Sequence, residues 1–194
     1  MLGLKLETDP RWVNIAEKNI GEVLTDHAYC EQKAATNAIS IMISYPYYQD
    51  LVEEMIKLAK EELTHFEMVH QKIIERGFKL GFERKDEYVN DLYRFMRKGY
   101  NKDIVLIDRL LFAAMIEARS CERFKLLSEQ IQDADLKTFY RELMISEAQH
   151  YTTFIGFARK YGSTIEDIDA RWQEWLNFEA NLLKKYSKSE SIHG

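Results

Sequence analysis

Two Glu-x-x-His motifs give this sequence its clearest chemistry, because a helix presents residues three apart on one face. Each motif is preceded, at a similar interval, by one more glutamate. Together these positions supply six candidate metal ligands: Glu31, Glu62, His65, Glu117, Glu147 and His150. Carboxylate and imidazole donors suit iron or manganese better than calcium, and a set without thiolates disfavours structural zinc. The pattern therefore predicts a centre with two metal ions.

Helix phase separates these candidates from nearby decoys. With a rotation of about 100° per residue, apolar side chains surround Glu62 on its helix, whereas Glu67 and His70 of a third match lie about 140° and 80° away. On a later helix, Glu122 lies about 140° from Glu117. We therefore predict that Glu67, His70 and Glu122 are not ligands.

Burial of the four candidate carboxylates has an energetic consequence. An isolated ionised carboxylate in an apolar interior is costly and would normally protonate, and four close together would repel one another. Two divalent cations would balance the four negative charges. The alternative is that Arg, Lys or Tyr side chains satisfy the glutamates and that the histidines are ordinary polar core residues.

Composition indicates one nearly all-helical domain. The chain has 194 residues, is 46% hydrophobic and contains only two prolines and eight glycines, which favours helices around a single core over residues 1–186. Residues 187–194 read as a polar tail, and His193 is assigned no role. Cys30 and Cys121 form no disulfide framework, and no apolar run or signal peptide is evident, so we expect a cytoplasmic protein that does not enter a membrane.

Turn and cap signals predict the order of the helices. The signals are Asp9–Pro10, Pro46, Gly77, Asp133 and a capping box at Ser163–Glu166. They predict helices at about 10–45, 47–76, 85–98, 103–130, 134–162 and 163–186. Short turns within the first and second pairs of long helices, and a long connection between the pairs, predict an all-α, ferritin-like antiparallel four-helix bundle. It has a long crossover between helices 2 and 3 and an additional C-terminal helix.

Four stretches around the candidate ligands resemble the bacterial tRNA hydroxylase family MiaE. They are Asp26–Ala35, Glu61–Phe66, Glu117–Phe124 and Ser146–Tyr151. The similarity covers about residues 9–183, and the Asp-His-Ala-x-Cys-Glu and Ala-Arg-Ser-Cys-Glu-Arg runs are its most specific part.

This resemblance implies an O₂-dependent diiron monooxygenase. The implied substrate is the methylthiolated, isopentenylated adenosine beside the anticodon of tRNA, hydroxylated on its isopentenyl group. The six candidates would be the ligands of two iron ions, with manganese as the alternative metal. Electrons would come from a separate reductase, since the chain has no flavin or nicotinamide fingerprint. His27 and Tyr151, each one turn from a ligand, are candidates to support the centre, or else core residues with a satisfied polar tip.

The predicted crossover is basic and aromatic. Residues 76–102 contain eight basic and four acidic residues in a chain whose net charge is −5. Candidate tRNA contacts in this segment are Arg84, Lys85, Arg94, Arg97 and Lys98. The aromatic residues between them could stack on bases, or could cover the bundle beneath a solvated crossover.

The main competing class is a ferritin-like ferroxidase, peroxidase or manganese catalase that acts on iron or peroxide instead of RNA. The chain lacks the Cys-x-x-Cys pairs expected of rubrerythrins. A helical binding scaffold without chemistry is a third class, which the buried carboxylates disfavour.

Overall fold

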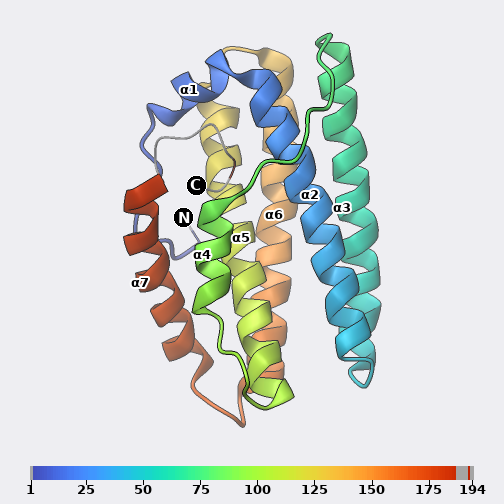
Figure 1. Ribbon diagram of the computed structural model, residues 1–194, viewed down its shortest axis with the longest axis vertical. Helices are drawn as coiled ribbons and strands as arrows, with labels where there is room; N and C mark the ends of the chain where they lie inside the picture. The colour runs from blue at the N-terminus through green and yellow to red at the C-terminus, as the bar shows by residue number, and fades with distance from the viewer. Residues whose placement is uncertain (1, 187–191, 193–194) are drawn as a thin grey trace. The chain divides into compact units, whose positions relative to one another are not determined.

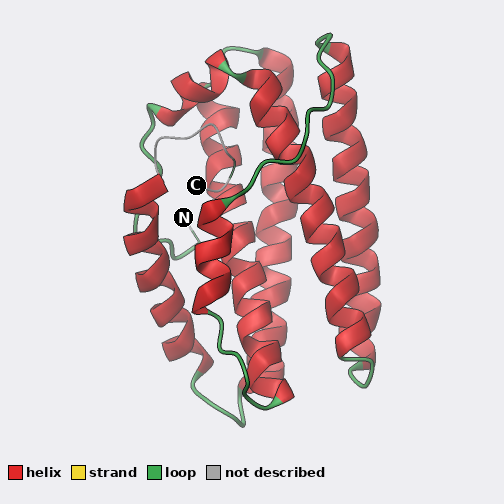
Figure 2. Ribbon diagram, in the orientation of Figure 1, coloured by secondary structure: helices red, strands yellow, loops and turns green. Residues whose placement is uncertain are grey.

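A computed structural model of the chain describes residues 2–186 and residue 192. Over these residues the chain is helical and contains no strand (Figures 1 and 2). The helices of this described part are α1 (Trp12–Lys18), α2 (Ile20–Ser44), α3 (Gln49–Glu75), α4 (Glu87–Phe95), α5 (Lys102–Gln130), α6 (Ala134–Gly162) and α7 (Ile168–Tyr186). They form two compact units, one of residues 18–85 with Ile192 and the other of residues 2–17 and 86–186.

The smaller unit is a hairpin of α2 and α3. Pro46 lies in the turn between them, where it cannot continue a helix. At the far end of α3, Gly77 adopts φ 72°. The N–H groups of Gly77 and Phe78 donate to the carbonyls of Ile74 and Ile73 at 2.9 and 3.0 Å. This left-handed glycine ends the helix where the sequence predicts.

In the larger unit, α5 and α6 form a second hairpin whose helices begin at side-chain caps. Asn101 Oδ1 accepts from the N–H of Asp103 at 2.7 Å at the start of α5. Asp133 Oδ1 accepts from the N–H groups two and three residues on, at 2.9 and 3.1 Å, at the start of α6. The predicted turn at Asp133 is therefore confirmed.

A network of buried charge fastens α4 and α7 to α5. Arg119 of α5 is fully buried and donates to Glu179 of α7 at 2.6 Å and to Glu122 at 2.9 Å. The hydroxyl of Tyr88 on α4 donates to the same Glu179 oxygen at 2.9 Å. Glu179 of α7 is therefore bonded both to the guanidinium of Arg119 on α5 and to the hydroxyl of Tyr88 on α4.

The predicted start of the last helix is wrong. The helix begins at Ile168, and Asp167 Oδ1 caps it by accepting from the N–H of Ala170 at 3.0 Å. Glu166, expected to complete the capping box with Ser163, instead forms an ion pair with Arg97 at 2.5 Å. A tertiary ion pair therefore displaced the local cap.

The first predicted helix is interrupted at Asn19, where φ is −132° and ψ is 36°. Asparagine is poorly suited to a helix interior, because its side chain competes for backbone hydrogen bonds. The expected single helix over 10–45 is consequently two helices, α1 and α2.

Most of the predicted polar tail, including His193, lies outside the described residues. Ile192 is described and buried, and its N–H donates to Asp26 Oδ2 at 2.7 Å within the smaller unit. No helix over residues 2–186 is long and apolar enough to cross a membrane. The single domain over 1–186 stays a prediction.

Candidate metal centre

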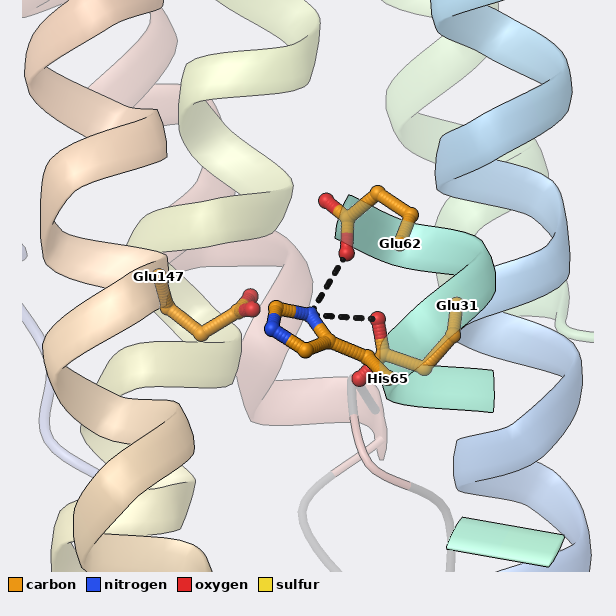
Figure 3. Close-up of side chains that lie close together, drawn as sticks. All are labelled: Glu31, Glu62, His65 and Glu147. Carbon is orange, nitrogen blue, oxygen red and sulfur yellow. Dashed lines mark hydrogen bonds and ion pairs between the residues drawn. The ribbon is translucent and has the colours of Figure 1, made fainter. Parts of the chain in front are cut away.

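The smaller unit brings three of the predicted ligands together. Glu31 lies on α2, and Glu62 and His65 lie on α3, with all three side chains buried. His65 Nδ1 lies 2.9 Å from Glu62 Oε2 and 3.8 Å from Glu31 Oε2, as the dashed lines of Figure 3 show. One potential ligand atom from each of the three lies within 4.8 Å of the others. The two helices thus supply two carboxylates and an imidazole at metal-binding spacing.

The neighbouring decoy motif faces away from this group. Glu67 is exposed, and His70 is half-buried, with its ring stacked on Phe66 at a centroid distance of 6.3 Å. The helix-phase argument therefore separated His65 from His70 correctly.

The larger unit assembles the other three predicted ligands. Glu117 lies on α5, and Glu147 (also drawn in Figure 3) and His150 lie on α6, all buried. His150 Nδ1 lies 4.0 Å from Glu147 Oε1. Potential ligand atoms of the three residues lie within 4.8 Å of one another. Each unit therefore carries the same set of donors, two carboxylates and one imidazole.

Glu122, the decoy on α5, binds Thr8 and Arg119 in the larger unit. Its two oxygens accept from the N–H and hydroxyl of Thr8, at 2.9 and 2.6 Å, and from Arg119. It is buried, which the helix-phase argument did not predict. The sequence offered one signal for this role, an arginine three residues earlier on the same helix.

The pKa values of Glu31 and His65 in the smaller unit are both raised, so both side chains tend to keep their protons. Burial raises the pKa of Glu31 to about 8, and the nearby charge of Glu62 adds to this, against the opposing contacts of His65. Burial disfavours the charged form of His65, but contacts with Glu31 and Glu62 outweigh it and raise its pKa to about 10. A divalent cation would replace these protons, so the group fits a metal by its chemistry.

His27 lies within hydrogen-bonding distance of Glu31, as expected of a residue that orients a candidate ligand. Its Nε2 lies 2.6 Å from Glu31 Oε1, one helical turn away, and the ring is fully buried. Tyr151 lies one turn beyond Glu147, and its ring packs against Trp172 of α7 at a centroid distance of 5.9 Å. Burial raises the pKa of Tyr151.

Cys121 is a neutral filler beside the larger unit's group. Its sulfur donates to the carbonyl of Met144 at 3.3 Å. Burial, followed by the charge of Glu147, raises the pKa of the thiol to about 12. A thiol that holds its proton this strongly is a poor metal ligand.

The predicted tRNA contacts lie in different local settings. Arg84, with Lys85 in the smaller unit, pairs with Glu22 at 3.6 Å. In the larger unit, the ammonium of Lys98 lies 4.5 Å from the centre of the Tyr93 ring. Arg97 is bound by two carboxylates on α5 and before α7, which counts against its contact with phosphate. The five stay predictions: Arg84, Lys85, Arg94, Arg97 and Lys98.

Comparisons with known proteins give one consistent result. The family model described as tRNA-(MS[2]IO[6]A)-hydroxylase (MiaE) matches residues 2–194. A tRNA 2-(methylsulfanyl)-N(6)-isopentenyladenosine(37) hydroxylase of Pseudomonas putida is 38% identical over 155 residues, covering 80% of this chain and 74% of the relative. A protein of the same name from Salmonella typhimurium is 28% identical, covering 98% of this chain and 87% of the relative.

A solved structure confirms the ferritin-like fold class. Its title is "Protein 43 with aldehyde deformylating oxygenase activity from Synechococcus", and it matches with a TM-score of 0.87 and 34% identity over 98% of this chain and 95% of that one. With the family model matched along almost the whole chain, the protein belongs to the MiaE family of tRNA hydroxylases.

Proposed function

We propose that this protein hydroxylates the isopentenyl group of the methylthiolated, isopentenylated adenosine beside the anticodon of tRNA. Membership of the MiaE family and the names of two relatives support the substrate and the reaction. In this reaction one atom of O₂ enters a C–H bond and the other leaves as water. Two electrons would come from a separate reductase and two protons from solvent. The observation that carries the proposal is the pair of buried ligand groups, one in each unit.

We further propose that the six candidates hold two iron ions that activate O₂. Each unit would contribute one group, which consists of Glu31, Glu62 and His65 in one unit and Glu117, Glu147 and His150 in the other. In each group, two carboxylates against one divalent ion leave no excess charge, whereas the two carboxylates alone would repel each other.

The chain's own side chains would set the geometry of this centre. The Nε2–H of His27 would hold Oε1 of Glu31, so that Oε2 is the oxygen directed to a metal. Tyr151 would be held by Trp172 one turn from Glu147. Both are positioning residues in this proposal.

Metal binding can be tested independently of turnover. The purified protein, loaded with ferrous iron, should hold about two ions per chain. His27→Leu should weaken the binding of iron about 10- to 100-fold in a chelator competition, whereas His27→Gln, which keeps a side-chain N–H, should lose less. Equal affinities of His27→Leu and the unaltered protein would remove His27 from the centre.

The reaction test uses an anticodon stem–loop that carries the modified adenosine. Iron-loaded protein, a chemical reductant and O₂ should add one oxygen atom to the isopentenyl group, detected by mass spectrometry of the released nucleoside. Glu117→Ala should abolish the product. Product formation without iron would contradict the proposal.

Competing functions are separate arms of the same experiment. The solved neighbour is named for aldehyde deformylating oxygenase activity, so an aldehyde is one alternative substrate. Ferrous iron and hydrogen peroxide are the others, for a ferroxidase, peroxidase or manganese catalase. Rapid turnover of any of these, with no change in the stem–loop, would favour the competing class.

We propose that tRNA phosphates contact Arg84, Lys85, Arg94 and Lys98. Arg94 is the easiest to test, because its side chain is 64% exposed although it pairs with Asp91. Replacing Arg94 and Lys98 with alanine should lower the slope of log Kd against log salt by about 1 to 2. The matched control is Lys57→Ala, which removes an exposed, ion-paired lysine of α3.

A further inference from the structure

The segment between α3 and α4 is held against α2 at Gly81. This segment has no regular secondary structure and crosses α2 (Figure 1). The Tyr29 hydroxyl donates to the Gly81 carbonyl at 3.0 Å, and the Gly81 N–H donates to Thr25 Oγ1 at 3.4 Å. A Cβ at position 81 would lie 3.3 Å from Thr25 Cγ2. Glycine therefore allows the backbone to lie directly on the helix.

The residues that follow are also tied to α2. Glu83 forms an ion pair with Lys33 at 2.9 Å, and Arg84 forms one with Glu22 at 3.6 Å. Position 82 thus lies between a hydrogen-bonded glycine and two ion-paired side chains, all within the smaller unit. Its backbone is fixed on both sides.

Phe82 projects from this fixed backbone into solvent, and 95% of its surface is exposed. Burying a phenylalanine side chain stabilises the folded state. The exposed ring of Phe82 does not contribute this stabilisation. Phe78, four residues earlier, is less exposed, at 43%, and its ring lies 3.3 Å from where a Cβ on Gly21 would be. The other aromatic residues of the crossover are less exposed: Tyr88, Tyr93, Phe95 and Tyr100.

The charge around Phe82 indicates what its ring would meet. Lys79, Arg84 and Lys85 lie within three residues of it; Glu83 pairs with Lys33, and Arg84 pairs with Glu22. A flat apolar ring among basic side chains suits a ligand that has aromatic faces joined by anionic links. Single-stranded RNA has this chemistry, because its bases can stack on the ring and its phosphates can contact the basic side chains.

We propose that Phe82 is a stacking platform for an unpaired base of the tRNA anticodon loop. This inference rests on the proposed function, which supplies the RNA, and it adds a residue that recognises a base rather than a phosphate. Arg84 and Lys85 would hold the backbone beside the stacked base. Phe82 touches neither ligand group, so the contact should contribute to affinity without affecting metal binding.

The test measures binding of the full-length, iron-loaded protein to a fluorescently labelled anticodon stem–loop by anisotropy. Phe82→Ala should raise Kd about 10- to 100-fold, since one base–aromatic stack typically accounts for such a change. Phe82→Trp should retain the affinity, and Phe82→Leu should lose most of it. Because the ring carries no charge, the salt slope should stay unchanged in Phe82→Ala and fall by about one in Arg84→Ala.

Tyr47→Ala is the matched control, because Tyr47 is also an aromatic residue of the smaller unit and is 89% exposed. Its Kd, and the iron content of every variant, should equal those of the unaltered protein. If the unaltered protein binds the stem–loop and Phe82→Ala binds equally well, the stacking inference is wrong. Full affinity in Phe82→Leu would also overturn it, since that contact would need no aromatic face. If the unaltered protein does not bind the stem–loop, the proposed function fails and this inference fails with it.

Discussion

Replacing Glu122 should separate structural carboxylates from metal-binding ones on the same helix. Glu122 and Glu117 are both buried on α5 and five residues apart. The side chain of Glu122 accepts two hydrogen bonds from Thr8 and one from Arg119. Glu122→Ala should therefore destabilise the protein and leave its metal content intact, whereas Glu117→Ala should lower the metal content.

The loss of stability can be estimated from the groups that Glu122→Ala leaves without their acceptor, which are Arg119 and Thr8. Breaking a buried ion pair costs about 3–5 kcal/mol when the remaining charge is uncompensated. Arg119 keeps Glu179 at 2.6 Å, so its charge stays partly compensated. The two donors of Thr8 lose a charged acceptor, which is typically about 1.5–3 kcal/mol for each bond. We expect a loss of about 3 kcal/mol, or about 6–12 °C in Tm for a chain of this size.

Urea denaturation and thermal melting of the iron-loaded protein would measure this loss. The control is Glu129→Ala, which removes an exposed α5 carboxylate paired with Lys125 at 3.9 Å and should change stability by less than about 0.5 kcal/mol. Iron per folded chain is measured on the same samples. A Glu122→Ala protein as stable as the control, or one depleted of iron like Glu117→Ala, would refute the reasoning.

Three further predictions use the same stability and metal assays. His65→Ala should lose iron, and His70→Ala should keep it; equal losses would contradict the helix-phase argument. Metal-free protein should become less stable as pH rises from about 5 to 9, because the raised pKa values of Glu31, about 8, and His65, about 10, mean that the folded state binds more protons than the unfolded state. Iron should remove this slope, since ligands bind deprotonated, and parallel melting profiles with and without iron would argue against ligand protonation. Arg97→Ala should cost about 2 kcal/mol by urea denaturation, because two carboxylates lose a charged partner; unchanged stability would restore Arg97 as a candidate RNA contact.

The helices could be predicted because their signals are local. Apolar periodicity, the glycine at position 77 and the cap at Asp133 all act within one turn of the residues they govern. The error at the start of the last helix arose where a distant residue intervened. Glu166 could have capped a helix at Ser163, but it pairs with Arg97, which lies far away in the sequence.

The orientation of the candidate ligands was predictable to the extent that helix phase is informative. Phase distinguished His65 from His70 because α3 has one buried and one exposed face. On α5, which is buried on several faces, phase placed Glu122 off the ligand stripe but could not show that it is buried too. Its partner Thr8 comes from the N-terminal segment, which no periodicity connects to α5.

The exposure of Phe82 was beyond sequence reasoning for a related reason. An aromatic residue in a connecting segment either packs underneath or faces solvent, and the pattern of residues is the same in both cases. The choice depends on tertiary anchors, here the hydrogen bonds of Gly81 with Tyr29 and Thr25. Charge counting also could not show that Arg97 is ion-paired with Asp108 and Glu166, because it treats an ion-paired arginine and an exposed one alike.

The chain's buried carboxylates differ in whether arginine or histidine faces them. Burial opposes ionisation of Asp108, but hydrogen bonds from Arg171 and Arg97 outweigh it and lower its pKa. Glu31 is buried as deeply, yet its pKa is raised, because it faces an imidazole and a second carboxylate instead of guanidinium groups. Arginine is permanently charged and cannot bind a metal, whereas a neutral imidazole can. An arginine therefore already balances the negative charge of its carboxylate partner. A carboxylate paired with histidine would have its charge balanced when a metal cation replaces the proton. By this criterion Glu31 is a candidate metal ligand, whereas Asp108 is a structural carboxylate of the larger unit.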